Sequence, residues 1–298
     1  MLLHSMDTRK TSIALCLGAS LASVAAVLQG APASAAPSET LSQQVRDAQS
    51  AEAKWQFGKA IDIYGLAMGA APSDQALRLL LKRRALAFEK ISLLPKAEAD
   101  FTSALAVVPV DPMLYADRGY FYLRHKRYDL ATGDFATGAR SEPRSPLFRF
   151  AMGRVRAAMS DYLGAIECYN DALLLDHKYG PAILSRAEAY VHLNRLEEAK
   201  ADYDRAVGLD FRREGDRFYS FLGRGYVSIR LEDFTGAIRD LDEALVTEPT
   251  DMNALLFRGY AYERRGSADL ALRDYERAFV ANPENSWIRA GLRRLRSN

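Results

Sequence analysis

The chain has 298 residues, 49% of them hydrophobic and 26% charged, which is the composition of a folded protein with a sizeable core. This composition argues against a disordered or collagen-like chain. The net charge of +2 comes from 40 basic and 38 acidic residues, so charge alone does not favour nucleic acid or an anionic membrane surface as a partner. A local basic patch remains compatible with this balance.

The first 35 residues predict an export signal. Arg9 and Lys10 precede an apolar run from about Ser12 to Leu28, and the small residues 33–35 follow as a cleavage site. We expect cleavage after Ala35, which leaves an exported chain without an integral membrane span. An uncleaved N-terminal anchor is the alternative, although the run is short for a spanning helix and rich in Ala, Ser and Gly.

Removal of residues 1–35 also removes Cys16, so that Cys168 is the only remaining thiol. The mature chain therefore has no intramolecular disulfide and depends on its core for stability. A short segment, residues 36–40, precedes the first repeat.

An internal repeat occupies most of the mature chain. The repeat begins with an alanine, which is followed by an aromatic residue four positions later, a second alanine three positions after that, and a proline five positions further on. This pattern occurs from Ala60 to Pro72 and from Ala97 to Pro109. It returns, with lapses, from Ala131, Ala165, Ala199, Ala237 and Ala271. The steps between the first alanines are 37, 34, 34, 34, 38 and 34 residues, and regular self-similarity of this length is typical of a solenoid.

Each repeat predicts two helices. Leu255, Gly259 and Tyr262 have the three- and four-residue spacing of one helix face, and they precede the second helix marked by the alanine pattern. A short turn such as residues 265–267 separates the helices, and the Pro ends the second helix because it cannot continue the hydrogen-bond ladder. We therefore expect a series of helical hairpins in which Gly and Ala allow close backbone approach and aromatic residues fill the space beside them.

On these residues the sequence resembles the tetratricopeptide repeat family. The resemblance covers about residues 41–285, as seven repeats, and implies an all-α, right-handed superhelical solenoid. Residues 286–298 predict an amphipathic capping helix in which Trp287, Ile288, Leu292 and Leu295 cover the last hairpin. Departures from the family pattern are Leu241 for an aromatic, Gly138 for Ala, and His177 and Phe211 for Pro.

The 38-residue step places four extra residues in or near residues 208–217. Four residues make about one helical turn. The insertion predicts either a longer second helix in the fifth repeat or a charged loop, and contact with a partner is a minority interpretation.

An arginine in the first helix and an aspartate sixteen residues later recur in five repeats. The pairs are Arg84 and Asp100, Arg118 and Asp134, Arg186 and Asp202, Arg224 and Asp240, and Arg258 and Asp274. In the fourth repeat both residues change together, to Met152 and Cys168, and the first repeat has Asp47 and Ile63. This joint change favours a structural salt bridge within each hairpin over five equivalent active sites, and it makes Cys168 a packing residue.

The sequence offers no catalytic constellation. His125 and His192 lie two repeats apart and His177 lies in a turn, so the spacing required for a zinc site or a histidine-based triad is absent. No glycine-rich phosphate loop is present. We therefore predict no catalytic, cofactor-binding or metal-binding residues.

The resemblance instead implies a concave groove lined by fixed places of each first helix. Those places hold Tyr120, Phe150, Arg154, Glu188, Tyr219, Tyr226, Tyr260 and Glu263 among aliphatic residues. A basic edge follows, with Lys90, Arg124, Arg230 and Arg264. Tyrosine gives a large contact area with a polar tip, which is typical of binding surfaces. Packing between neighbouring helices is the alternative role for about half of these residues.

The resemblance implies a scaffold that binds a protein or peptide partner in this groove, without cofactors or nucleic acid. With the export signal, we expect it in the bacterial periplasm or outside the cell. The alternative is an accessory subunit that holds a glycan or lipid for an envelope enzyme or assembly complex. Catalysis by the chain itself ranks last.

Overall fold

The computed structural model describes residues 35–71, 73–107, 111–209 and 214–297, with side chains described from residue 41 onward except that of residue 214. The predicted signal peptide therefore lies outside the described residues, apart from Ala35. The chain divides into two compact units between Pro143 and Arg144. We describe each unit by itself, as a first unit up to Pro143 and a second unit from Arg144.

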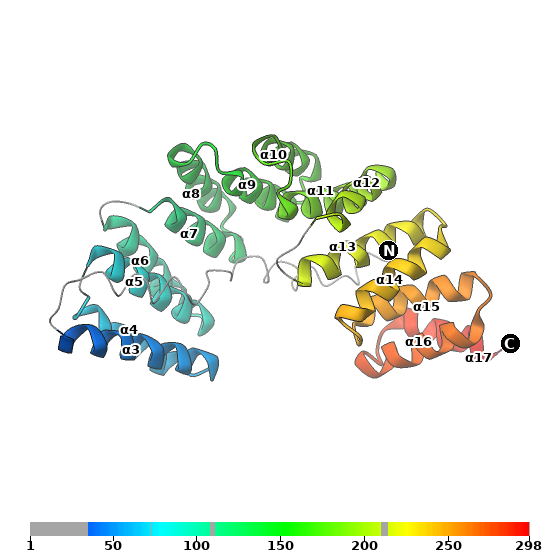
Figure 1. Ribbon diagram of the computed structural model, residues 1–298, viewed down its shortest axis with the longest axis horizontal. Coiled ribbons are helices and arrows are strands. Elements are labelled where there is room, and N and C mark those ends of the chain that lie inside the picture. Colours follow the sequence, from blue (N-terminus) through cyan, green and yellow to red (C-terminus); the bar gives the residue numbers. More distant parts are fainter. Residues whose placement is uncertain (1–34, 72, 108–110, 210–213, 298) are drawn as a thin grey trace. The chain divides into compact units, whose positions relative to one another are not determined.

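The described part of the first unit consists of three helical hairpins (Figure 1). Their helices are α3 (Ala35–Ala53) with α4 (Phe57–Met68), α5 (Asp74–Lys90) with α6 (Leu94–Ala106), and α7 (Pro112–Arg124) with α8 (Tyr128–Ser141).

The second unit has four hairpins and a final helix. Its helices are α9 (Pro146–Ala158) with α10 (Tyr162–Leu175), α11 (Gly180–His192) with α12 (Leu196–Val207), α13 (Glu214–Arg230) with α14 (Phe234–Thr247), α15 (Met252–Arg264) with α16 (Ala268–Ala281), and α17 (Ser286–Arg296). The described residues contain these helices and no strand, so the prediction of an all-α repeat fold is confirmed.

Every hairpin turn contains one residue in the left-handed backbone region. These residues are Trp55, Ser92, Lys126, Ser160, Asn194, Glu232 and Gly266, with φ between 58° and 77°. Each is the middle residue of the three that separate the two helices. Since only glycine adopts this conformation without steric cost, the six other turns are held in place by the packing of the helices on either side.

Glycines in the first helices allow the second helices to approach. A Cβ atom at Gly119 would lie 2.5 Å from the ring of Phe135, and one at Gly153 would lie 2.5 Å from the ring of Tyr169. A Cβ atom at Gly225 would meet the side chain of Leu241. Leu241, which stands where the family pattern has an aromatic residue, therefore fills the same space with an apolar side chain. In the second unit these contacts belong to one continuous cluster of buried residues from Phe150 to Leu292.

The departure at His177 leaves the repeat geometry in place. Helix α10 ends at Leu175 without a following proline, and the guanidinium of Arg205 donates a hydrogen bond of 3.1 Å to the backbone oxygen of His177. Two hairpins later Arg277 donates in the same way to the oxygen of Pro249. The turn is therefore secured from the next hairpin whichever residue it holds. The departure at Phe211 lies outside the described residues.

The four extra residues do not lengthen the second helix of the fifth hairpin, so that interpretation was wrong. Helix α12 has 12 residues and ends at Val207. Instead α13 has 17 residues, four more than α11 or α15, because it begins one turn earlier. Since residues 210–213 lie outside the described ranges, the charged-loop interpretation stays a prediction.

The five arginine and aspartate pairs join the two helices of their hairpins. In each pair Nε and Nη2 of the arginine donate to the two carboxylate oxygens at 2.6–2.8 Å. The aspartate side chains are 4–8% exposed and the arginine side chains 15–26% exposed. Such two-point, charge-assisted pairs fix both distance and orientation.

Four of these arginines also reach the preceding hairpin through Nη1. The acceptors are Thr102 for Arg118, Asn170 for Arg186, Asp204 for Arg224 and Asp242 for Arg258. Each of these arginines therefore connects three helices. The first hairpin of the second unit, with Met152 and Cys168, has neither group of the pair.

We expect Arg258→Met to lower the free energy of unfolding by about 2–4 kcal/mol, between the values for exposed and fully buried pairs, because Asp274 would stay buried without its partner. Adding Asp274→Cys should restore most of the loss, since hairpin α9/α10 carries this combination. Urea unfolding of the two single variants and the double variant measures the coupling.

Arg217→Met is the matched control, because Arg217 pairs with Glu243 on the exposed surface; its effect should stay within about 0.5 kcal/mol. Additive losses in the double variant would contradict the proposed pairing.

We expect Gly266→Ala to destabilise the protein by about 1 kcal/mol, because alanine pays the steric cost of the left-handed conformation. A Cβ atom there would contact nothing within 4 Å, so the cost is purely conformational. Glu232→Ala at the equivalent turn should change stability little, since that site already holds a residue with a Cβ atom. Equal losses at the two turns would show that another effect dominates.

Candidate functional site

The first helices of the second unit form one surface. Helix α11 packs beside both α9 and α13, and α13 packs beside α15. We call the exposed side of these four helices the inner face. The sequence prediction places Phe150, Arg154, Glu188, Tyr219, Tyr226, Tyr260 and Glu263 on it.

Phe150 and Tyr226 are packing residues, which corrects their assignment to an open groove. Each is 2% exposed. Phe150 packs against Tyr169 and Tyr179, with ring centroids 5.8 and 5.6 Å apart, and Tyr226 packs against Phe257 at 5.2 Å. Phe150 is therefore covered by its own second helix and by the residue that precedes α11, and Tyr226 is covered by the neighbouring first helix α15.

Glu263 and Tyr260 make bonds within the fold. Glu263 accepts two hydrogen bonds from Arg294 of α17, at 2.7 and 2.9 Å, and one from the hydroxyl of Tyr275 at 2.8 Å. The hydrogen bond from Arg294 lowers the pKa of Glu263. The hydroxyl of half-buried Tyr260 accepts a 2.9 Å hydrogen bond from Arg264. Glu263 therefore attaches the capping helix.

In the first unit, Tyr120 is half-buried on α7, with its ring edge-on to Phe135 at 5.1 Å. The basic edge of the sequence prediction is also engaged. Arg124 binds both carboxylate oxygens of Glu89, while in the second unit Arg230 donates to Tyr226 and Asn194. Arg124 and Arg230 therefore each connect to the preceding hairpin, and Arg230 also bonds within its own helix.

Arg154, Glu188 and Tyr219 form the centre of the inner face. Arg154 and Tyr219 are half-buried, and Glu188 is solvent-accessible. Surrounding protein nevertheless displaces much of the water near Glu188, and this desolvation raises the pKa of its carboxyl. The positive charge of Arg154 lowers the same pKa by a smaller amount. Glu188 makes no hydrogen bond and no ion pair within 4 Å to any described residue. We call Glu188 uncommitted because no residue in the described part of the chain is bonded to its carboxylate.

Two polar groups beside this centre were missed by the sequence prediction. Asn253 holds the same repeat place on α15 as Tyr219 on α13, and its buried Oδ1 accepts no hydrogen bond from the described residues. Tyr203, on α12, lies close enough for the charge of Glu188 to help raise its pKa, although burial is the larger cause. Extending the family places to every hairpin would have found Asn253, whereas the approach of Tyr203 depends on folding.

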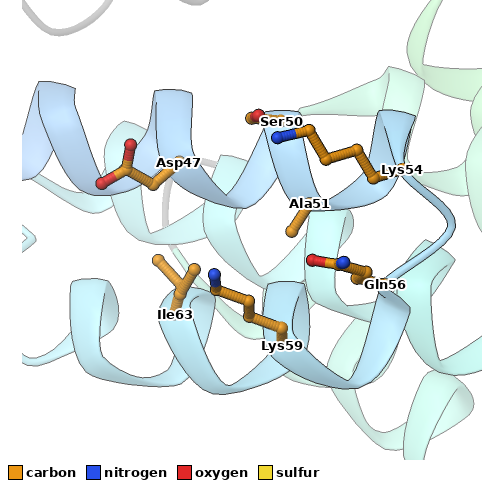
Figure 2. Close-up of a pocket in the computed structure, with 7 residues that line it drawn as sticks. All are labelled: Asp47, Ser50, Ala51, Lys54, Gln56, Lys59 and Ile63. Atoms are coloured by element: carbon orange, nitrogen blue, oxygen red, sulfur yellow. The ribbon is translucent and has the colours of Figure 1, made fainter.

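A hollow of about 380 Å³ lies between α3 and α4 in the first unit (Figure 2). Asp47 and Ile63, which replace the arginine and aspartate of other hairpins, form part of its wall, together with Lys54 and Lys59. The missing pair thus leaves a gap between the two helices. Most of its lining consists of exposed charged or polar side chains, so it lacks the enclosed, converging polar groups of a ligand site.

The described residues contain no group of three or more His, Cys, Asp or Glu side chains arranged to hold a metal ion. His192 stacks on Tyr162 at 4.2 Å, and desolvation lowers its pKa. His125 lies 2.9 Å from Glu89. Cys168 is only partly buried, yet desolvation raises the pKa of its thiol, which disfavours the reactive thiolate.

None of the helices in the described part of the chain combines the length and apolarity needed to cross a membrane.

We expect Glu188→Gln to raise stability at pH 7, because the raised pKa means that the ionised carboxylate costs stability in the folded state. The cost is absent below the ordinary carboxyl pKa and grows as pH rises through the raised value. The gain should therefore vanish near about pH 3.5, where the carboxyl is protonated in both states.

Urea unfolding at the two pH values measures this gain. Glu197→Gln, at an exposed site on α12, is the control and should bring no gain. A Glu188→Gln variant that is less stable at pH 7 would contradict the assignment of an uncompensated charge.

Curated relatives match large parts of the chain at low identity. Superkiller protein 3 of Schizosaccharomyces pombe is 23% identical over 247 residues, covering 78% of this chain and 18% of its own length. Meiotically up-regulated gene 93 protein of the same organism is 37% identical over 104 residues, covering 30% and 27%. DnaJ protein P58IPK homolog B of Oryza sativa is 25% identical, covering 74% and 50%. The chain spans between a fifth and a half of these relatives.

Solved structures show the same fold. A tetratricopeptide repeat protein from Parabacteroides merdae matches with a TM-score of 0.57 and 17% identity, covering 87% of this chain and all of that one. The Cut9 and Hcn1 complex of the APC/C matches with a TM-score of 0.63 and 14% identity, covering 78% and 49%. YrrB, described as a tetratricopeptide repeat protein with an unusual peptide-binding site, has a TM-score of 0.52 and 16% identity, covering 64% and 96%.

Family models described as tetratricopeptide repeat match residues 82–146, 181–212 and 222–286. These ranges together cover more than half of the chain, and no catalytic family is indicated among them. Within the matched ranges lie all five arginine and aspartate pairs and most of the hairpin turns. The chain belongs to the tetratricopeptide repeat family.

Proposed function

We propose that this protein is a non-catalytic adaptor that binds a polypeptide segment along the inner face of its second unit. Tetratricopeptide repeat proteins generally mediate protein–protein interaction. The carboxylates on this face differ in whether they have a bonded partner within the fold. Glu263 is bound by Arg294 and Tyr275, whereas Glu188 has no hydrogen-bond partner among the described residues. The uncommitted carboxylate beside half-buried Tyr219 is the observation that carries the proposal.

The rigidity of the face supports this role. Arg186, Arg224 and Arg258 each join three helices next to it, so its side chains are positioned before a partner arrives. A preorganised surface loses little conformational entropy on binding. The peptide-binding site described for YrrB is a precedent within the same fold.

We place this activity outside the cytoplasm, in the bacterial periplasm or in the medium. The proposal rests on Arg9 and Lys10, the apolar run up to about Leu28 and the small residues 33–35. Cleavage after Ala35 would leave a chain without a signal segment and with Cys168 as its only thiol, which suits a compartment where paired cysteines oxidise.

The direct test is affinity capture from fractionated cells with the full chain as bait. We expect the wild type to retain a polypeptide from the extracytoplasmic fraction, and Tyr219→Ala with Tyr260→Ala to retain at least tenfold less, because truncated tyrosines at a binding surface typically cost about 1–2 kcal/mol each. Tyr226 is left unchanged because it is buried. Circular dichroism checks that the variant keeps its helicity.

Leu174→Ala is the matched control, since Leu174 is exposed on a second helix, α10, away from the inner face. Equal recovery by the wild type and the tyrosine variant would move the site elsewhere. Retention of a glycan instead of a polypeptide would support a glycan-holding accessory subunit, and a partner found only in the cytoplasmic fraction would contradict the proposed location.

A further inference from the structure

The charges around the inner face fall into two groups. Arg186, Arg224 and Arg258 hold aspartates of their own hairpins, and Glu263 holds Arg294 of the capping helix. These four side chains have their counter-ions within the fold. Glu188 is different, because it is accessible and no described residue donates a hydrogen bond or forms an ion pair with it. In the described part of the chain, Glu188 therefore has no directly bonded counter-ion, and Arg154 acts on it only through its charge.

Three tyrosines lie near this carboxylate. The charge of Glu188 contributes to the raised pKa of Tyr169, Tyr203 and Tyr219, for each of which desolvation is the larger cause. The ring of Tyr203 fills the space beside Gly223 of α13, where a Cβ atom would lie only 2.3 Å from its Cζ. Tyr169 and Tyr203 are buried, so of the three only half-buried Tyr219 can meet a partner. An accessible carboxylate near an accessible aromatic ring is suited to a cation, because the ring face and the anion both attract positive charge.

Further acidic residues act on the same region. Besides Glu188, the residues Asp251, Glu248 and Asp216 all influence Tyr219 electrostatically. Asp251 is engaged as the N-cap of α15, where its Oδ1 accepts from the backbone nitrogen of Ala254 at 2.8 Å. Arg154 is the cation that acts on Glu188, whereas the charged groups that act on Tyr219 are acidic. The resulting negative potential attracts cations and repels a carboxylate.

We propose that Glu188 is the counter-ion for an arginine or lysine side chain of the bound polypeptide, with Tyr219 lying beside the aliphatic and charged parts of that side chain. The inference rests on the proposed function, since it assigns the residue class that the inner face selects. The occupant is a segment of another protein with at least one accessible cationic residue. A free terminal carboxylate is disfavoured here by the acidic surroundings.

Selection of random dodecapeptides displayed on phage tests the inference, with the full chain as the immobilised target. We expect peptides selected on the wild type to share an arginine or lysine at one position, enriched at least fivefold over the starting library. Glu188→Gln should still select peptides, through the apolar and aromatic contacts, but without the shared cationic position. Glu197→Gln, from the exposed surface of α12, should select as the wild type does.

The best selected peptide is then synthesised with its arginine or with citrulline, which replaces the guanidinium by a neutral group of similar shape. We expect citrulline to weaken binding to the wild type at least tenfold and binding to Glu188→Gln less than twofold. Fluorescence polarisation gives the dissociation constants.

The possible failures are distinguishable. Selected peptides without a shared cationic residue, or an equal loss with citrulline in both proteins, would overturn the role of Glu188 and leave peptide binding intact. Failure to select any peptide on the wild type would overturn both this inference and the proposed function.

Discussion

The structure depends on a two-point ion pair between the two helices of a hairpin, which occurs in five of the seven described hairpins. The pair fixes the separation and rotation of the two helices, because two of the three nitrogens of a planar guanidinium donate to the two oxygens of one aspartate. Its remaining nitrogen reaches the preceding hairpin in four cases, as between Arg258 and Asp242. The same spacing goes with close packing of the Phe135 ring against Gly119, at a distance that would not admit a Cβ atom. The ion pairs thus set the relative positions of the helices, whereas the stability of the fold comes mainly from the burial of apolar side chains.

The pairing of charges within the fold also indicates which charged residues are available to bind a partner. A charge that has a partner inside the fold contributes to structure, whereas one without a partner costs stability unless a ligand compensates it. Glu188 belongs to the second class, and it lies among tyrosines on helices whose positions the ion pairs have already set. The hollow beside Asp47 and Ile63 shows the other consequence of a missing pair, a gap lined by exposed side chains. In hairpin α9/α10, by contrast, Met152 and Cys168 replace the arginine and the aspartate. Both are less polar, so neither leaves a buried charge without a partner.

Much of this fold follows from the sequence, because each hairpin is built from local signals. Alanine and aromatic spacing gives the helices, and the sixteen-residue separation of Arg84 and Asp100 repeats often enough to indicate contact. The extra helical turn belongs to α13 and not to α12. The sequence could not predict this, because the spacing of the repeats does not show which of two successive helices contains inserted residues. The site was less predictable. Phe150 and Tyr226 hold binding positions of the family, yet they are buried. Their exposure depends on contacts with other helices and with the next hairpin, which no single repeat encodes.

The central claim is that the inner face of the second unit contacts a polypeptide while the second helices support it. Photo-crosslinking in intact cells measures this directly, with p-benzoylphenylalanine placed at Tyr219 on the inner face or at Glu243, exposed on α14. The account predicts an adduct of higher mass from position 219 and none from position 243. An adduct from position 243 alone, or equal adducts from both, would contradict it.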